Sequence, residues 1–248
     1  MRAGKQPEEK PESALKQKDI DCDTLQWFNA TYAMFVESQS MDYHLIGGYN
    51  DESDADKPYL LSALESSWGI TDRKSALDTL YWLASSGHAE GFRVDIQAMA
   101  LYGWLELSRE EMHQGIMDLA DGETLTEENA AMLADYFVQE REVYEICGEN
   151  GIDAWDYCRF MQIAGDSYYA GFLTLEEMLA LQLEMSLAIQ QQFDSWEAMN
   201  QSYLQGYTYW VQDSYGATKR RWAYERLLEA EDCPWKVLDF NMTLEKFW

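Results

Sequence analysis

The chain is 248 residues long, and 47% of its side chains are hydrophobic and 14% aromatic, a composition too apolar for an intrinsically disordered protein. Forty-five acidic side chains outnumber 18 basic ones, which gives a formal net charge of -27. This charge repels phosphate groups, so we expect neither nucleic acid nor an anionic membrane as a partner. A basic protein or a cation would suit the surface better.

The first 20 residues are predicted to form a polar, disordered tail. They hold Pro7, Pro11 and many charged side chains but few large apolar groups, so they cannot bury enough surface to offset the entropy lost on ordering. They also lack the apolar stretch of a secretory signal, and no apolar run in the chain approaches the ~18 residues of a membrane span. We therefore expect a cytoplasmic protein.

Residues 21–56 are predicted to form one helix, at about 23–37, followed by a loop. The loop starts at Gly47-Gly48 and continues through turn-forming residues. A helical domain is expected over 57–248. Its first helix is predicted to begin at Lys57-Pro58, because proline is well placed in a first helical turn.

Within 57–248, helix start and stop signals follow one another closely. Ser108 with Glu111, and Thr174 with Glu177, have the spacing of capping boxes, and Gly148 and Gly171 are typical of helix ends. Strand signals are scarce. The sequence predicts an all-α fold, a compact single domain of about nine or ten helices with an extended C-terminal segment at 233–240.

The most apolar predicted helix covers residues 152–170, and an all-round apolar helix is normally buried. Yet Asp156, Arg159 and Asp166 fall in a narrow stripe on one of its sides, and buried charges require partners. One interpretation is structural, with Arg159 held between the two carboxylates. The other is functional: the three side chains line a pocket, where Arg159 binds an anionic group and a carboxylate serves as a general base.

Motifs of the common enzyme and metal-binding classes are absent from the sequence. His88 is predicted at a helix end, which is more typical of a capping or dipole partner than of a metal ligand. Ser195 is interpreted as a helix cap rather than a nucleophile. The basic cluster Lys219-Arg220-Arg221, with Arg226, is expected to dock locally on acidic helices; the alternative is self-association, in which it pairs with the acidic face of another copy. We predict no metal site and no cofactor.

Several short motifs occur in a distinctive order. They are Trp68-Gly69-Ile70, Leu80 to Leu83, Gly87-His88, Ala154 to Arg159, Tyr169 to Glu177, Phe193 to Glu197, and Cys233-Pro234-Trp235. Together they resemble the bacterial family catalogued as domain of unknown function 1266, over roughly residues 60–240. The resemblance implies no reaction, but its D-x-x-R motif falls on Asp156 and Arg159, and its F-D-S-W-E motif adds Trp196 to the candidate residues. The chain departs from the family pattern at Phe172, where Tyr is expected, and at Cys233, where Ser is expected.

From the sequence we favour a non-catalytic protein-interaction module whose acidic surface and aromatic side chains bind a protein partner. The alternative is an enzyme or small-ligand binder with a pocket around Asp156 and Arg159. The candidate residues for a pocket or buried polar cluster are Asp156, Arg159, Asp166, His88 and Trp196. The sequence does not decide whether the protein is an enzyme, nor does it give the oligomeric state.

Overall fold

The computed structural model describes residues 22–120, 125–211, 214–246 and 248, so the predicted tail lies outside the described residues. All regular structure in the described part is helical, which confirms the all-α prediction. Ten of its α-helices are 11 to 21 residues long, and α11 is a single turn. The α-helices are α1 (Asp23–Ser38), α2 (Lys57–Trp68), α3 (Arg73–Ser85), α4 (Ala89–Leu101), α5 (Arg109–Leu119), α6 (Glu127–Cys147), α7 (Asp153–Ala170), α8 (Leu175–Gln192), α9 (Trp196–Val211), α10 (Ser214–Glu229) and α11 (Pro234–Val237). Short 3₁₀ turns are η2 (Ile46–Gly48), η3 (Trp104–Glu106) and η4 (Gly148–Asn150).

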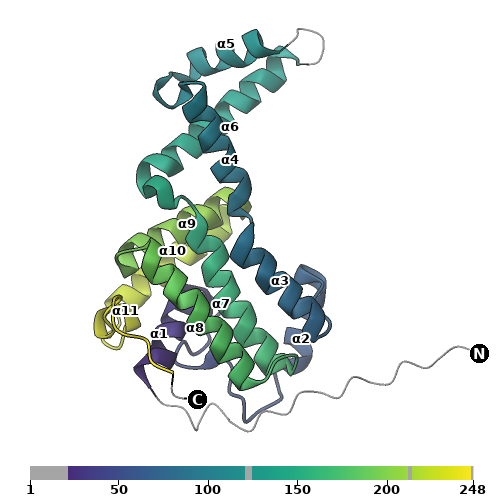
Figure 1. Cartoon of the computed structure of the whole chain (residues 1–248), viewed down its shortest axis with the longest axis vertical. Coiled ribbons are helices and arrows are strands. Elements are labelled where there is room, and N and C mark those ends of the chain that lie inside the picture. Colours follow the sequence, from purple (N-terminus) through teal and green to yellow (C-terminus); the bar gives the residue numbers. More distant parts are fainter. Residues whose placement is uncertain (1–21, 121–124, 212–213, 247) are drawn as a thin grey trace, which may run out of the picture.

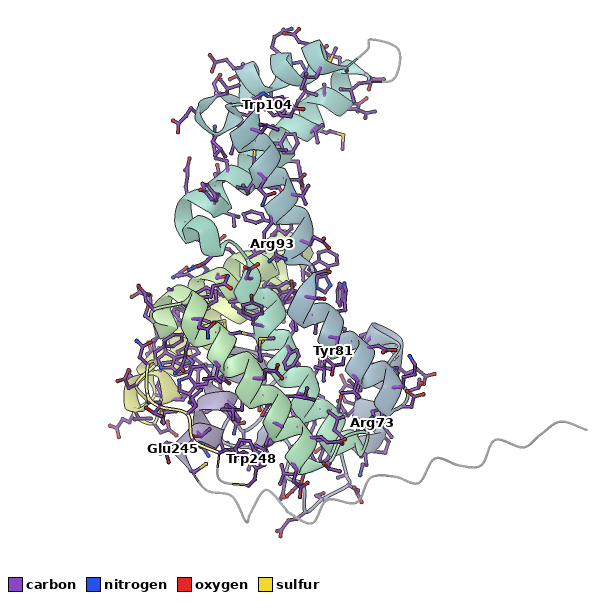
Figure 2. All side chains as sticks on the ribbon, viewed as in Figure 1. Arg73, Tyr81, Arg93, Trp104, Glu245 and Trp248 are labelled. Carbon is purple, nitrogen blue, oxygen red and sulfur yellow. The ribbon has the colours of Figure 1, made fainter. Side chains whose placement is uncertain are left out.

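The helices form two regions, which we call the body and the arm (Figure 1). The body contains α1 to α3 and α7 to α11. The arm contains α4, η3, α5 and α6, and it projects from the body along the long axis of the molecule. Figure 2 shows Trp104 near the outer end of the arm, far from Trp248 in the body.

Local signals set the ends of several helices as the sequence predicts. The Ser108 and Thr174 side chains form capping boxes at the starts of α5 and α8. Gly171 ends α7 with a positive φ of 86°. The hydroxyl of Ser195 accepts a hydrogen bond from the backbone N–H of Ala198 in the first turn of α9, at 3.2 Å, which confirms its role as a helix cap.

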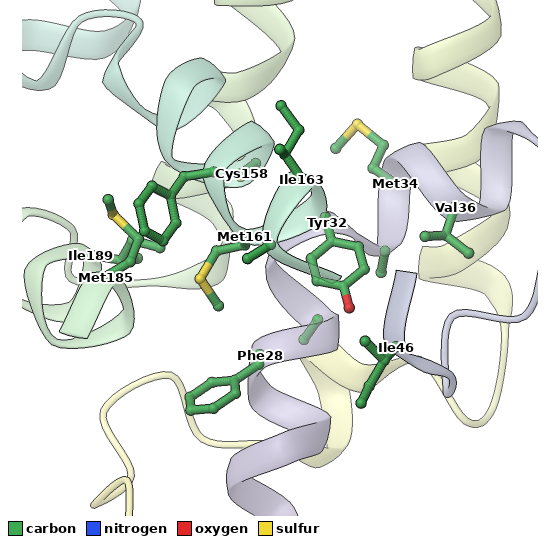
Figure 3. Close-up of a cluster of buried hydrophobic side chains, with 14 of the residues drawn as sticks. Phe28, Tyr32, Met34, Val36, Ile46, Cys158, Met161, Ile163, Met185 and Ile189 are labelled. Carbon is green, nitrogen blue, oxygen red and sulfur yellow. The ribbon is translucent and has the colours of Figure 1, made fainter. Parts of the chain in front are cut away.

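The central helix of the body is α7, which packs against α1, α3, α8 and α9. Figure 3 shows Phe28 and Tyr32 of α1 facing the same cluster as Met161 of α7 and Ile189 of α8. Helix α1 is therefore part of the main hydrophobic core, although it lies before residue 57. Because α7 is enclosed on several sides, polar side chains on it are desolvated unless they face a cavity or each other.

The arm has two smaller hydrophobic clusters of its own. One contains Phe92, Met99 and Ile152, and the other contains Met112 and Ile116. Small clusters of this kind bury less apolar area than a central core, so they contribute less to the free energy of unfolding.

The arm meets the body through a polar network between α4, α6 and α9. The Tyr209 hydroxyl donates to Glu140 Oε1 at 2.9 Å, and it lies 2.6 Å from the Tyr136 hydroxyl. Tyr136 donates in turn to Asp95 Oδ2 at 3.1 Å. Glu140 is fully buried, its Oε2 has no hydrogen-bond partner among the described residues, and burial raises its pKa to about 7.

The C-terminal segment begins with the single turn α11 and then continues without regular structure through residue 246. The indole N–H of Trp27 donates to the Phe240 carbonyl at 3.0 Å, which attaches this segment to α1. None of the helices in the described ranges is both long and apolar enough to cross a membrane.

Candidate functional site

The body contains a cavity of about 750 Å³, bounded by α2, α7 and the stretch from the end of α1 to Tyr49. Buried side chains form its floor, whereas Gln39, Asp56, Tyr59 and Ser67 on its rim are exposed. The cavity therefore reaches solvent. Its lining residues are Phe35, Gln39, Met41, Gly48, Tyr49, Asp56, Tyr59, Leu60, Ala63, Leu64, Ser67, Trp68, Trp155, Arg159, Gln162, Asp166, Tyr203 and Arg220.

Helix α7 lines the cavity with Trp155, Arg159, Gln162 and Asp166. These residues are four, three and four positions apart, a spacing that places them on one face of a helix. Asp156 is not among the lining residues, because it lies about 100° around the helix from Trp155. The polar stripe predicted from the sequence is thus divided between this cavity face and a neighbouring face.

The side chain of Arg159 is held between two indole rings. Its Cζ atom lies 4.2 Å from the ring centroid of Trp68 and 4.3 Å from that of Trp155, distances at which cation–π attraction is significant. Burial lowers the pKa of Arg159 to about 10, and the negative charge of Asp156 opposes this shift. The guanidinium is still charged at neutral pH. Within the described part of the chain, no carboxylate oxygen lies within 4.0 Å of its nitrogens.

A second arginine, Arg220 of α10, lines the same cavity and is only 7% exposed. Its Cζ atom lies 4.8 Å from the ring centroid of Phe35 and 5.0 Å from that of Tyr207. It donates to the hydroxyl of Ser38 through Nη1, while its Nε has no hydrogen-bond partner in the described residues. It also has no carboxylate within ion-pair distance there.

The two arginines act on a common side chain, Tyr203 of α9. Burial raises the pKa of the Tyr203 phenol, and the positive charges of Arg220 and Arg159 oppose that rise. One end of the cavity is therefore cationic. The basic cluster of the sequence pointed to Arg220. Local docking on an acidic helix is seen for Arg226, whose Nε donates to Glu37 Oε1 of α1 at 2.7 Å, whereas the side chain of Arg220 lies among aromatic rings inside the body.

The other end of the cavity contains Asp166, which is 5% exposed. Gln162 Nε2 donates to its Oδ2 at 3.1 Å, and its Oδ1 is buried with no hydrogen-bond partner among the described residues. Burial raises the pKa of this carboxyl to about 8, so Asp166 is largely protonated at neutral pH. Arg159 is thus not held between two carboxylates.

Asp156 has a structural position beneath the cavity. Its Oδ2 accepts the backbone N–H groups of His88 at 2.7 Å and Ala89 at 2.8 Å, and its Oδ1 lies 2.7 Å from His88 Nδ1. These contacts satisfy the first free N–H groups of α4, as an N-terminal cap does. Gly87 must lack a side chain here, because a Cβ would lie 2.2 Å from Asp156 Oδ2.

His88 connects this cap to the cavity arginine. Its ring centroid lies 4.6 Å from that of Trp82 and 4.2 Å from that of Trp210, and Arg159 Nη1 lies 3.1 Å from its Nδ1. The role of His88 in this geometry is to position Arg159 and the start of α4.

Trp196 lies away from the cavity. It packs against Trp27, with ring centroids 5.0 Å apart, and against Phe240, at 4.9 Å, and it donates to the Leu238 carbonyl at 2.9 Å. These contacts attach the C-terminal segment to the body. Of the five candidate residues, Arg159 and Asp166 line the cavity, Asp156 and His88 support Arg159, and Trp196 belongs to the core.

No group of three or more His, Cys, Asp or Glu side chains gathers in the described residues as a metal site would require.

Comparison with known proteins matches residues 63–240 to the family described as protein of unknown function (DUF1266). The chain is 30% identical over 182 residues, 72% of its length, to the uncharacterized protein YbeU of Escherichia coli (strain K12), of which 71% is covered. It is 29% identical over 147 residues to the uncharacterized protein YbeR of the same organism. This match covers 59% of the present chain and 56% of YbeR. No solved structure matches. The family match includes Arg159, Asp166 and Arg220, whereas Phe35 and Tyr49 of the cavity precede it.

Proposed function

This chain belongs to the DUF1266 family, whose description assigns no function, and we propose from its cavity that it binds a small organic anion. One observation carries the proposal. Arg159 and Arg220 line one cavity, and no carboxylate among the described residues lies within 4.0 Å of either, although the chain has 45 acidic side chains. A buried charge is unfavourable without a partner, and an anionic ligand would be that partner.

The arrangement suits a carboxylate or phosphate group on a small molecule. The planar guanidinium presents paired N–H donors that match two anionic oxygens. The rings of Trp68 and Trp155 hold the Arg159 plane, so less side-chain entropy is lost when a ligand binds. A volume of about 750 Å³ falls within the ~300–1,000 Å³ usual for small-molecule sites.

We propose binding without a reaction. Asp166, the carboxyl on the cavity face of α7, is seven residues and about two helical turns from Arg159. It is therefore poorly placed to act as a base on a group held by the arginines.

The proposal can be tested by titrating the protein with sodium caproate, a simple monocarboxylate, and following binding by NMR or calorimetry at constant ionic strength. We expect saturable binding that weakens at least about tenfold in Arg159→Met and in Arg220→Met, equivalent to about 1.4 kcal/mol. Arg221→Met is the matched control, because Arg221 is exposed on the same helix and the change removes the same charge. Equal binding by all four proteins, or no saturable binding, would contradict the proposal.

The protein-interaction module favoured by the sequence stays a second proposal, and one observation favours it. The arm exposes large apolar side chains, among them Leu101 at 81%, Met132 at 64% and Leu119 at 60%. Large exposed apolar side chains mark a binding surface when they form a contiguous patch. A photo-crosslinking residue at position 101 should then capture one defined protein in a native lysate, whereas the same residue at the exposed body position Val237 should not. Identical capture from both positions would speak against a specific surface on the arm.

A further inference from the structure

The two ends of the cavity differ in chemistry, and α7 sets the distance between them. Arg159 and Asp166 lie on the same face of α7, seven residues apart, which is about 10 Å along the helix axis. The cationic end holds Arg159 and Arg220, and the other end holds a buried carboxyl. A ligand that contacts both ends must therefore be elongated.

Asp166 has no cationic partner among the residues that the structure describes. In the described residues no Lys, Arg or His nitrogen lies within 4.0 Å of its carboxyl, and Oδ1 has no hydrogen-bond partner. Tyr32 of α1 faces this carboxyl, but its hydroxyl already donates to Asn29 Oδ1 and accepts from the Gly47 N–H. The other titratable side chain beside it is Tyr49, whose pKa the Asp166 charge helps to raise.

Apolar side chains line the cavity beside its polar groups. Leu60 and Leu64 of α2 are 3% and 2% exposed and line it together with Trp68 and Tyr49. The two leucines would favour methylene groups of a ligand by removing them from water.

We infer that the ligand is an elongated zwitterion, whose anionic group binds at Arg159 and Arg220 and whose ammonium group binds at Asp166. This inference rests on the proposed function, because it adds a second charged group to the same small anion. An ammonium has three N–H donors, and one of them would hydrogen-bond to the Asp166 carboxylate. Its positive charge would favour the ionised form of this carboxyl, which burial disfavours.

Four small probes test the inference: ε-aminocaproate carries both charges, caproate only the carboxylate, hexylamine only the ammonium, and β-alanine both charges at a shorter separation. We expect ε-aminocaproate to bind about tenfold more tightly than caproate, as one added buried ion pair of about 1.4 kcal/mol would give. Neither β-alanine nor hexylamine should bind as tightly as ε-aminocaproate, since neither can contact both ends.

Two variants assign the contacts to residues. Asp166→Asn keeps the shape of the side chain but removes its charge, so it should bind ε-aminocaproate and caproate equally well. Arg159→Met should weaken binding of both. In the wild-type protein the advantage of ε-aminocaproate should increase between about pH 6 and pH 9, because the ammonium favours the ionised form of a carboxyl whose pKa is about 8.

The possible failures are distinguishable. If caproate binds and ε-aminocaproate binds no more tightly, the zwitterion inference is wrong and the anion-binding proposal stands. If the advantage of ε-aminocaproate persists in Asp166→Asn, its ammonium binds elsewhere, and the inference is again wrong. If none of the probes binds, both proposals fail.

Discussion

The body and the arm are built from similar helices, but their buried polar groups have different surroundings. In the body, Arg159, Arg220 and Asp166 line an open cavity, and both Arg220 Nε and Asp166 Oδ1 have no hydrogen-bond partner among the described residues. In the arm, Glu140 is buried against two tyrosines, which contact Asp95 in turn. Polar groups that face a cavity are available to a ligand, whereas those that face one another hold two elements together. The proposed ligand site therefore belongs to the body, whereas the buried network of Glu140 joins the root of the arm to the body.

The largest expected effect is at the joint between the two regions. Gly87→Ala places a Cβ 2.2 Å from Asp156 Oδ2 at a φ of +60°, so it displaces the carboxylate that caps α4. We expect a loss of more than about 4 kcal/mol in the free energy of unfolding, measured by urea denaturation.

Gly103→Ala in the arm is the control for that substitution. Its φ is +70°, but nothing lies within 4 Å of the added Cβ, so only the left-handed backbone penalty of about 1–2 kcal/mol applies. Equal losses in the two variants would show that the Asp156 contact does not matter at the joint.

Truncating one buried methionine in each region should show that the body and the arm differ in their contribution to stability. Met161 in the body and Met112 in the arm are both 0% exposed. We expect Met161→Ala to lower global stability by about 3–4 kcal/mol, because it leaves a void in the main core. Met112→Ala should instead accelerate hydrogen exchange in α5 and leave the amides of α7 protected. Equal acceleration in α5 and α7 would mean that the arm and the body unfold as one unit.

The buried carboxyl of the cavity predicts a pH effect. Asp166 has a pKa of about 8 in the folded protein, above the ordinary value of about 3.9 expected when unfolded. Between these values the folded state retains a proton that the unfolded state has released, so stability falls as pH rises from about 4 to about 8. Relative to wild type, Asp166→Asn should gain stability progressively between about pH 4 and about pH 8, with little difference at the lower pH. A constant difference across urea titrations at these pH values would contradict this assignment.

The same reasoning predicts a smaller effect in the arm. The pKa of Glu140 is raised to about 7 by burial, so its destabilising contribution develops between about pH 4 and pH 7. Glu140→Gln should gain stability over that interval relative to wild type, by less than Asp166→Asn because the pKa of Glu140 is raised less. Hydrogen exchange in α6 should show this gain more clearly than exchange in α8, and the reverse order would place Glu140 outside the attachment of the arm.

The smallest expected effect on stability is at the cavity arginine. Arg159→Met removes two cation–π contacts but no ion pair with a carboxylate, so we expect a loss of about 1 kcal/mol or less in thermal or urea unfolding. A loss of about 3–5 kcal/mol would instead support the structural interpretation, in which Arg159 is a core ion-pair residue.

The sequence predicted the helices well, because their signals are local. The caps at Ser108 and Thr174 and the end at Gly171 depend on residues within one or two turns. The burial of the helix at 152–170 also followed from its composition. The family resemblance, built from short motifs, is confirmed by the match over residues 63–240.

The cavity could be predicted only in part. The periodicity of α7 pointed to Arg159 and Asp166, but the cavity also needs Phe35, Tyr49 and Arg220 from distant segments. Their association depends on how α1, α2 and α10 pack around α7, which no local pattern in one sequence encodes. Asp156 was grouped with the other charges because it is only three residues from Arg159, yet its partners are backbone N–H groups of α4.

The unpartnered Oδ1 of Asp166 has a practical consequence for anyone engineering this protein. A screen for thermostability at neutral pH would select a neutral side chain at this position early, because such a change removes an unfavourable buried acid. The resulting protein would keep its fold and its other cavity walls. If Asp166 binds the ammonium of the proposed ligand, such a variant would distinguish ligands less well, so each stabilised variant should be assayed for binding before it is used as a substitute for the natural chain.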